Sequence, residues 1–210
     1  MEQIVLLGGG GHCKSILDSI LASGKFEVYG IIDNQPKFKS MFGIPFIGGD
    51  EFLPDLISKG IINIFITVGS VGNTQIRRKI YKKCRNLGFN FPNIIDKTAT
   101  VSRNSKISQG VFIGKNVVIN SDVIISDFAI INSGAIIDHE CSVGEFSHIS
   151  PGATLCGNVK IGSDTHIGAN ATVIQGITVA DHTLVGAGCV IIKDIHKSGV
   201  YVGNPAQFIK

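Results

Sequence analysis

The hydrophobic pattern of the C-terminal half of the chain repeats every six residues. From Val101 to Ile191 every sixth position is aliphatic, and sixteen such positions follow one another without a break. The position after each is mostly small or turn-forming, and the position four residues after it is small or β-branched. This period fits neither a 3.6-residue helix nor an alternating strand. It is typical of a solenoid of hexapeptides, each made of one short strand and one corner.

The repeat also predicts where the histidines lie. Three hexapeptides close one triangular coil of about 18 residues, so the series predicts about five coils. Residues one coil apart should lie above one another at the spacing of neighbouring strands, ~4.8 Å. His148 and His166 should therefore stack in one column. His139 lies half a coil before His148, on a different side of the triangle, so these two can meet only across a subunit boundary.

The N-terminal pattern is different and predicts a strand, a glycine turn and a helix. Residues 3–7 are an aliphatic run, four glycines follow, and a helical pattern begins near His12. This order opens a nucleotide-binding βαβ unit, in which the helix N-terminus holds anions. Only Gly8 and Gly10 match the dinucleotide fingerprint G-x-G-x-x-G, because its third glycine is Cys13. The mismatch weakens the case for NAD as the ligand and leaves other phosphate-containing ligands open. A glycine turn that binds no ligand is the alternative.

A second strand, 28–32, ends at Asp33 and Asn34. A carboxylate at this place suits a ribose or sugar hydroxyl, and a plain turn residue is the alternative. The helix that Asn73 or Thr74 should cap carries a run of basic residues, which we interpret as a solvated face. The remaining pattern predicts a loop over 35–48, a short helix over 50–58, a strand over 61–68 that ends at Gly69, a helix to about residue 88, and a last strand over 91–95.

The two patterns together predict an α/β plus all-β chain. Residues 1–96 should form a small Rossmann-like domain with a parallel sheet, and residues 97–210 a parallel β-helix. The hydrophobic fraction of 44% suffices for a core in each.

Composition narrows the function classes. The net charge of only +3 does not favour nucleic-acid binding. No apolar run is long enough for membrane insertion, and we expect no signal peptide. The five cysteines show neither metal nor disulfide spacing, which favours a reducing cytoplasm.

The densest titratable cluster of the solenoid is Asp138-His139-Glu140. Imidazole is a natural general base near neutral pH, and a carboxylate on one ring nitrogen fixes its tautomer and raises its basicity. Either Glu140 or Asp138 could be that carboxylate, and a solvated polar corner is the alternative. A metal-dependent lyase like the γ-class carbonic anhydrases is a further alternative, but the histidine spacing of that class is absent. We therefore expect no metal.

The run from Ile137 to Ala153 resembles the PglD/NeuD-type nucleotide-sugar and sialic-acid acetyltransferases. The segments 157–162, Gly10-Gly11-His12 and 201–206 extend the likeness over essentially the whole chain. The similarity is greatest to bacterial enzymes of glycan biosynthesis that N-acetylate a UDP-linked 4-amino-6-deoxy sugar. It implies a left-handed β-helix, acetyl-CoA as donor, a homotrimer, and an active site between adjacent solenoids.

The resemblance also implies roles for individual residues. His139 matches the general base and Glu140 its partner. Residues that match the acetyl-CoA contacts are His148, Ala169 and Ala187. Residues that match the nucleotide-sugar pocket, or lie in the turn expected to line it, are Gly10, Gly11, His12, Asp33, Asn34, Gly69, Asn73 and Thr74. No role is implied for His166.

The mechanism that we hypothesise is direct transfer, in which His139 deprotonates the attacking sugar amine. Gly157 lies one coil beyond His139, so its bare backbone is our candidate for holding the developing oxyanion. Three alternatives stay open: an O-acetyltransferase acting on sialic acid or another sugar, an N-acetyltransferase of a GDP-linked 4-amino sugar, and a non-catalytic sugar-nucleotide-binding trimer.

Overall fold

The computed structural model describes residues 1–210, which divide into two compact units. The α/β unit comprises Met1–Gly69 and Gln75–Ile94, and the β-helix unit comprises Ser70–Thr74 and Ile95–Lys210. The short segment Ser70–Thr74 therefore groups with the β-helix, although it lies within the range expected for the N-terminal domain. No helix of the structure combines the length and the apolar character needed to cross a bilayer.

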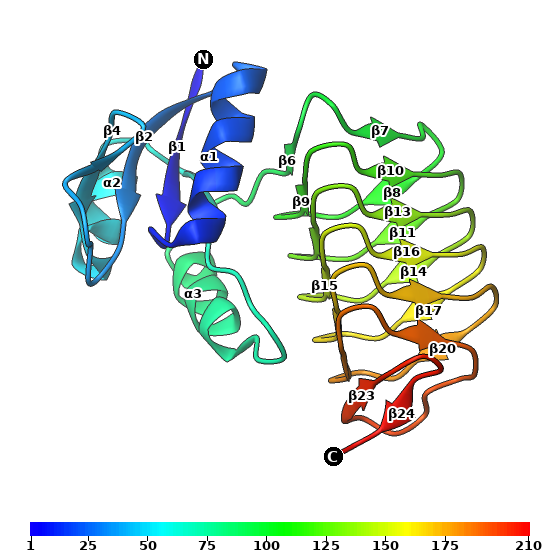
Figure 1. The fold of residues 1–210 in the computed structure, drawn as a ribbon. Coiled ribbons are helices and arrows are strands. Elements are labelled where there is room, and N and C mark those ends of the chain that lie inside the picture. The colour runs from blue at the N-terminus through cyan, green and yellow to red at the C-terminus, as the bar shows by residue number, and fades with distance from the viewer. The chain divides into compact units, whose positions relative to one another are not determined.

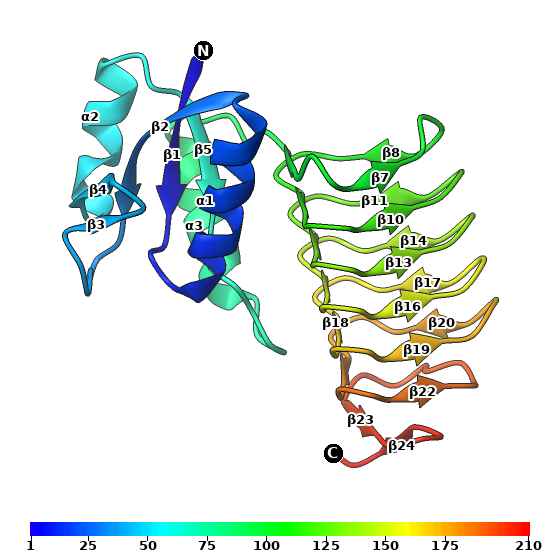
Figure 2. The ribbon, with the colours of Figure 1, turned by 45° about the horizontal axis from the view of Figure 1, so that its top comes forward.

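The α/β unit is built on one five-stranded sheet with the strand order β3-β4-β2-β1-β5 (Figures 1 and 2). Its strands are β1 (Glu2–Leu7), β2 (Phe26–Ile32), β3 (Ser40–Met41), β4 (Ile44–Gly48) and β5 (Asn63–Ile66). Its helices are α1 (Gly11–Ser23), the 3₁₀ turn η1 (Asp50–Phe52), α2 (Leu53–Ser58) and α3 (Gln75–Asn86). β1 pairs in parallel with both β2 and β5, which confirms the Rossmann-like α/β fold.

The local sequence explains the centre of this unit. The aliphatic run from Ile4 to Leu7 buries β1 almost completely, as expected for a strand between two parallel neighbours. α1 buries one face, which includes Ile16, Leu17 and Ile20. It ends at Gly24, whose left-handed φ of 63° suits a glycine after a helix.

Three sequence-based expectations for this unit were wrong. The predicted loop over 35–48 contains β3 and β4, which form a tight hairpin because Phe42 and Gly43 adopt positive φ at its turn. The predicted last strand over 91–95 shortens to β6 (Ile94–Ile95), which pairs with the β-helix. The basic helix is not wholly solvated, since Arg77 is only 2% exposed.

The β-helix unit is a left-handed parallel β-helix whose coils are stacked in register (Figure 1). One face carries β7 (Thr100–Val101), β10 (Val118–Ile119), β13 (Ile136–Ile137), β16 (Thr154–Leu155), β19 (Thr172–Val173) and β22 (Val190–Ile191). A second carries β8 (Lys106–Ile107), β11 (Ile124–Ile125), β14 (Ser142–Val143), β17 (Lys160–Ile161) and β20 (Thr178–Val179). The third carries β6, β9 (Phe112–Ile113), β12 (Ile130–Ile131), β15 (His148–Ile149), β18 (His166–Ile167), β21 (Leu184–Val185), β23 (Val200–Val202) and β24 (Gln207–Phe208).

The six-residue aliphatic series is the inner wall of this unit. Each member from Val101 to Ile191 is the second residue of a two-residue strand, and most contribute to a single buried core. The first residue of each strand points outward because successive side chains of a strand alternate. The hexapeptide interpretation is therefore confirmed.

Candidate active site

His139 and Glu140 form an exposed pair at the corner after β13. Nδ1 of His139 lies 3.0 Å from Oε2 of Glu140, and the two side chains are 55% and 63% exposed. A carboxylate beside Nδ1 keeps a proton on that nitrogen and leaves the lone pair of Nε2 directed outward. The pair therefore has the arrangement of an oriented general base.

Glu140 adopts a backbone conformation that few glutamates occupy. Every sixth residue from Gly110 to Gly188 has positive φ, and most of these residues are Gly, Asn or Asp. Glu140, at φ 59°, is an exception, and such a conformation costs on the order of 1 kcal/mol for an ordinary residue. The six-residue spacing could have identified this column from the sequence, because it lies three positions after each inward aliphatic.

Asp138 holds the backbone of the same corner. Its Oδ1 accepts hydrogen bonds from the N–H of His139 at 2.8 Å and from Nδ2 of Asn120, one coil earlier, at 2.9 Å. These two bonds, the backbone one first, lower the pKa of Asp138 below its usual value. Because Asp138 contacts the backbone N–H and Glu140 contacts the ring, the structure assigns the ring partner to Glu140.

Gly157 lies directly against the His139 imidazole. A Cβ added to Gly157 would come within 2.6 Å of both Cε1 and Nε2 of His139, so any side chain there would displace the ring. Gly157 is buried, and its N–H has no hydrogen-bond acceptor. A shallow cleft of about 500 Å³ opens at this place, lined by Asp138, His139, Cys156, Gly157, Asn158, Gln175 and Gly176.

His148 and His166 stack in one column, as predicted. They are paired residues of β15 and β18, and their ring centroids are 5.0 Å apart. Nδ1 of His148 lies 2.9 Å from the carbonyl oxygen of Ser70, so Nδ1 carries a proton, and Nε2 lies 3.2 Å from the amide nitrogen of Asn132. Nε2 of His166 contacts the Ser150 hydroxyl at 3.2 Å. Burial lowers the pKa of the His166 imidazole below its usual value.

His148 therefore does not join His139 within one chain. β15 belongs to the sheet that contains β18, whereas His139 follows β13 in another sheet. Ala169 and Ala187, the other two residues expected to contact acetyl-CoA, lie at successive corners after β18 and β21. The N–H of neither donates a hydrogen bond to the protein.

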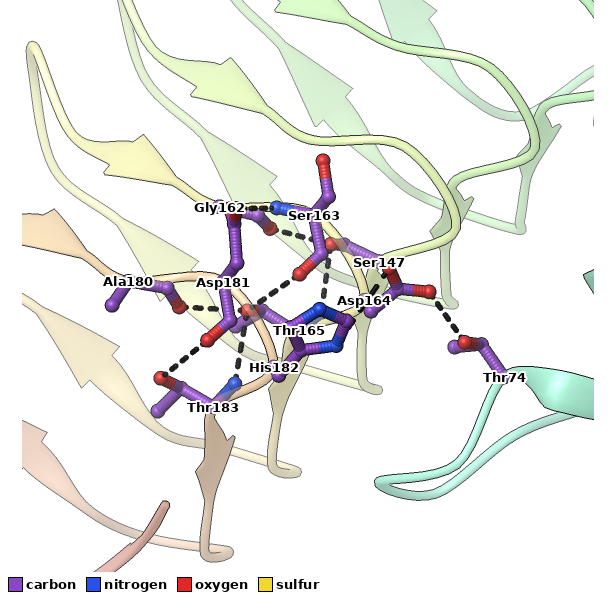
Figure 3. Close-up of polar contacts among 10 residues, drawn as sticks. All are labelled: Thr74, Ser147, Gly162, Ser163, Asp164, Thr165, Ala180, Asp181, His182 and Thr183. Carbon is purple, nitrogen blue, oxygen red and sulfur yellow. Dashed lines mark hydrogen bonds and ion pairs between the residues drawn. The ribbon is translucent and has the colours of Figure 1, made fainter. Parts of the chain in front are cut away.

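The segment Ser70–Thr74 packs on the β-helix unit. Besides the Ser70 carbonyl, the Thr74 hydroxyl donates to the carboxylate of Asp164, which also lies 3.8 Å from Nδ1 of His182 (Figure 3). The structure thus places Thr74 against the coils, whereas Gly69 belongs to the α/β unit. The turn expected to line one pocket is divided between the two units.

Buried hydroxyls support the corners around Asp164. Ser147 and Thr165 stand one coil apart, as do Thr165 and Thr183 (Figure 3). The Thr165 hydroxyl donates to the carbonyl of Ala180 at 2.9 Å and accepts the N–H of Thr183 at 3.2 Å. The Ser147 hydroxyl accepts the N–H of Thr165 at 3.0 Å in the same way. This ladder satisfies backbone groups that would otherwise be buried without partners.

The α/β unit contains a separate cleft of about 260 Å³. It lies at the carboxyl ends of β1 and β2, where ligands bind in open parallel sheets. Its polar groups come from Asp33, Asn34, Gln35, Asp50 and Lys83, and the remaining lining residues are Leu7, Gly8, Ile32, Leu53, Val68, Ile76, Ile80 and Cys84.

Asp33 fixes the glycine turn beside this cleft. Its Oδ2 accepts the N–H of Gly9 at 2.7 Å and its Oδ1 accepts the N–H of Gln35 at 2.9 Å. Gly10 and Gly11 face open space at the N-terminus of α1, but they do not line the cleft. Sequence reasoning missed Asp50 and Lys83, which form an ion pair at 3.0 Å, because they come from η1 and α3.

His12 is held neutral. Burial, and secondarily the charge of Arg77, lower the pKa of His12 to about 4. A neutral imidazole can hydrogen-bond a ligand without carrying charge. The structure arranges no group of three or more His, Cys, Asp or Glu side chains for a metal ion.

Comparisons with known proteins find a likeness for each of the two units. The chain matches the PglD N-terminal domain over residues 3–84 and the bacterial transferase hexapeptide of six repeats over residues 140–175 and 158–193. A comparison with curated proteins finds no match.

Solved structures give further likenesses. PerB from Caulobacter crescentus, in complex with CoA and GDP-perosamine, is 36% identical, with 100% of this chain and 98% of that chain covered and a TM-score of 0.93. The acetyltransferase domain of PglB from Neisseria gonorrhoeae FA1090 is 35% identical over 100% of both chains, with a TM-score of 0.92, and is also known in complex with acetyl coenzyme A. WeeI from Acinetobacter baumannii AYE, 18% identical over 100% of both chains with a TM-score of 0.67, shares the fold. The chain therefore belongs to the PglD/NeuD-type family of acetyl-CoA-dependent, hexapeptide-repeat sugar acetyltransferases.

Proposed function

We propose that the protein transfers an acetyl group from acetyl-CoA to the 4-amino group of a nucleotide-linked amino-deoxy sugar. The observation that carries the proposal is the His139–Glu140 pair, whose imidazole lies against Gly157, a residue whose N–H has no hydrogen-bond partner. A base and a backbone donor on one surface are what acyl transfer from a thioester requires.

In the proposed reaction, His139 removes a proton from the attacking amine. The amine nitrogen forms a bond to the thioester carbonyl carbon as Nε2 of His139 takes the proton. Glu140 stabilises the imidazolium that results. The bond from carbon to sulfur then breaks, and the imidazolium returns the proton to the departing CoA sulfur. His139 and Glu140 end the cycle as they began it.

The backbone donor acts at the carbonyl oxygen. Negative charge develops on that oxygen during attack, and a fixed N–H stabilises it without reorganisation. Gly157 supplies an N–H without a partner, in a residue that carries no side chain to block approach. For the rest of acetyl-CoA we propose the backbones of Ala169 and Ala187. His148 would act from a neighbouring subunit, because it lies on another face of its own coil.

We propose that the acceptor nucleotide binds the α/β unit. The cleft beside Asp33 and Asn34 offers carboxylate and amide groups for hydroxyls, and Lys83 offers a positive charge. Gly10, Gly11 and His12 at the start of α1 would approach the phosphates or the sugar, and Gly69, Asn73 and Thr74 stay predicted contacts. Binding energy gained at the nucleotide would then orient the distant amine.

The identity of the nucleobase in the acceptor is a separate question. The likeness of the sequence favours a UDP-linked sugar, whereas the structure of PerB holds GDP-perosamine. Both sugars are therefore acceptors to test. The homotrimer and the cytoplasmic location stay predictions from the sequence.

The test is thiol release from acetyl-CoA with UDP- and GDP-linked 4-amino sugars and free sialic acid. We expect turnover with a nucleotide-linked 4-amino sugar and a kcat lower by roughly 10²–10⁴-fold in His139→Ala, with acetyl-CoA binding retained. His196→Ala, at an exposed histidine outside both sites, is the matched control.

Each other outcome has a clear meaning. An unchanged kcat in His139→Ala would remove the general-base assignment. Release with sialic acid alone would replace the amine acceptor by a hydroxyl. A folded protein that binds the nucleotide sugar but never releases thiol would be a binding protein.

A further inference from the structure

Two stacked corner residues on one edge of the β-helix, Asn120 and Asp138, accept the following backbone N–H in the same way. Ile119, Ile137 and Leu155 pair in register through β10, β13 and β16, so the corner residues that follow them stack as well. At the first corner, the N–H of Ser121 donates to Oδ1 of Asn120 at 2.9 Å. At the second, the N–H of His139 donates to Oδ1 of Asp138 at 2.8 Å.

The next corner has no such bond. The corners at Ser102 and Ile174 in the same stack also lack it, but the following residues there, 103 and 175, are exposed, whereas Gly157 is buried. Cys156 stands where Asp138 stands one coil earlier and Asn120 two coils earlier. Its thiol is a poor acceptor, and the N–H of Gly157 has no hydrogen bond. The rest of the corner is held normally, since the N–H of Gly176 donates to the carbonyl of Gly157 at 2.9 Å and the Cys141 thiol donates to the carbonyl of Cys156 at 3.1 Å.

Gly157 therefore presents an unpaired backbone N–H at the candidate active site. Gly157 is buried, and a buried backbone N–H without a partner is rare in folded proteins. Stacking places this N–H one coil beyond that of His139, and Cys156 lines the same cleft as the imidazole. A donor left unpaired beside a general base points to a ligand oxygen.

We propose that Cys156 is a positioning residue for acetyl transfer: it leaves the Gly157 N–H available to the thioester carbonyl oxygen, where Asn or Asp would occupy it. The inference rests on the proposed function. It requires no reaction at the sulfur atom. The proposal predicts that position 156 tolerates a side chain that has no hydrogen-bond acceptor. It does not tolerate a side chain that accepts the following backbone N–H as Asn120 does.

The test compares Cys156→Asn with Cys156→Ala. The Asn side chain should accept the Gly157 N–H as Asn120 accepts that of Ser121, and kcat should fall by about 10²-fold, the usual effect of losing one oxyanion donor. The KM for the acceptor should stay the same, because the nucleotide cleft is untouched. Because alanine also carries no hydrogen-bond acceptor, the kcat of Cys156→Ala should exceed that of Cys156→Asn by the same factor. Equal kcat values in the two variants would overturn the proposal.

A second measurement does not depend on the acceptor. The infrared carbonyl stretch of ¹³C-labelled acetyl-CoA should move to lower frequency when bound to the wild type and to Cys156→Ala, and the shift should be lost in Cys156→Asn. If no acceptor supports turnover, the proposed function fails while this spectrum still decides the inference. Should Cys156→Asn not fold, Cys156→Asp makes the same comparison. Absence of the shift in the wild type overturns the inference by itself.

Discussion

The two units of this protein organise their corners in opposite ways. In the β-helix unit one corner recurs every six residues, with a positive-φ residue at the same place from Gly110 to Gly188. In the α/β unit each turn occurs once: the glycine turn at residues 8–11, the hairpin at Phe42-Gly43 and the helix end at Gly24 share no pattern. Because the corner of the β-helix is repeated, a residue that departs from the repeat can be recognised.

Two of the exceptions in the repeat fall at the candidate active site. Glu140 occupies a conformation that favours Gly or Asn, and its carboxylate meets His139. Phe128 and Phe146 occupy the same column for a structural reason, since their rings stack at 4.9 Å. Cys156 follows two corners at which Asn120 and Asp138 accept the next backbone N–H, and it accepts none. The α/β unit has no repeated turn, so its site had to be identified from the ends of its strands.

The first prediction concerns His12, a largely buried histidine of the α/β unit, which has no repeat. Its pKa is about 4 in the folded protein and 6.5 unfolded, so below pH 6.5 the unfolded chain binds more protons. The stability of the α/β unit should then fall as the pH drops from about 6.5 to 4, by about 3 kcal/mol in total. All helices belong to this unit, so urea unfolding followed by helical circular dichroism reports on it. His12→Gln should flatten the pH dependence, and an equally steep curve would contradict the assignment.

The second prediction tests the repeated unit. Thr165→Val removes the hydroxyl that serves both Ala180 and Thr183, and two buried backbone groups lose a partner. We expect a loss of about 2 kcal/mol, seen as a lower melting temperature by calorimetry. Thr172→Val, at an outward position with no side-chain hydrogen bond, should leave the melting temperature nearly unchanged. Equal effects would mean that the hydroxyl ladder contributes little.

The third prediction concerns two neighbouring glycines of the α/β unit. A Cβ at Gly9 would meet the Phe46 ring at 2.3 Å, whereas one at Gly11 meets nothing within 4 Å. Gly9→Ala should therefore destabilise the unit by about 1 kcal/mol, as the ring moves aside. Gly11→Ala should not destabilise it, because alanine is the better helix former. Urea midpoints of the two variants provide the comparison, and a reversal of their order would refute it.

The sequence predicted the fold where a pattern is local or repeated. The hexapeptide series, the strand-glycine-helix opening and the His148–His166 column all follow from spacing. It was wrong over residues 35–48, because a two-residue strand such as β3 carries too little periodicity. It was also wrong at Arg77, whose burial depends on what the other faces of its helix contact.

The candidate active site, like the fold, was predictable from the sequence only in part. From the sequence alone came the solenoid, its inner wall and the His139–Glu140 dipeptide, because neighbours in a regular corner have fixed relative positions. Only the tertiary structure chose Glu140 over Asp138, found Asn120 behind Asp138, and turned Gly157 toward the imidazole. It also brought Ser70 and Thr74 onto the coils. Contacts between residues distant in sequence depend on how coils and turns pack in three dimensions, which no local pattern encodes.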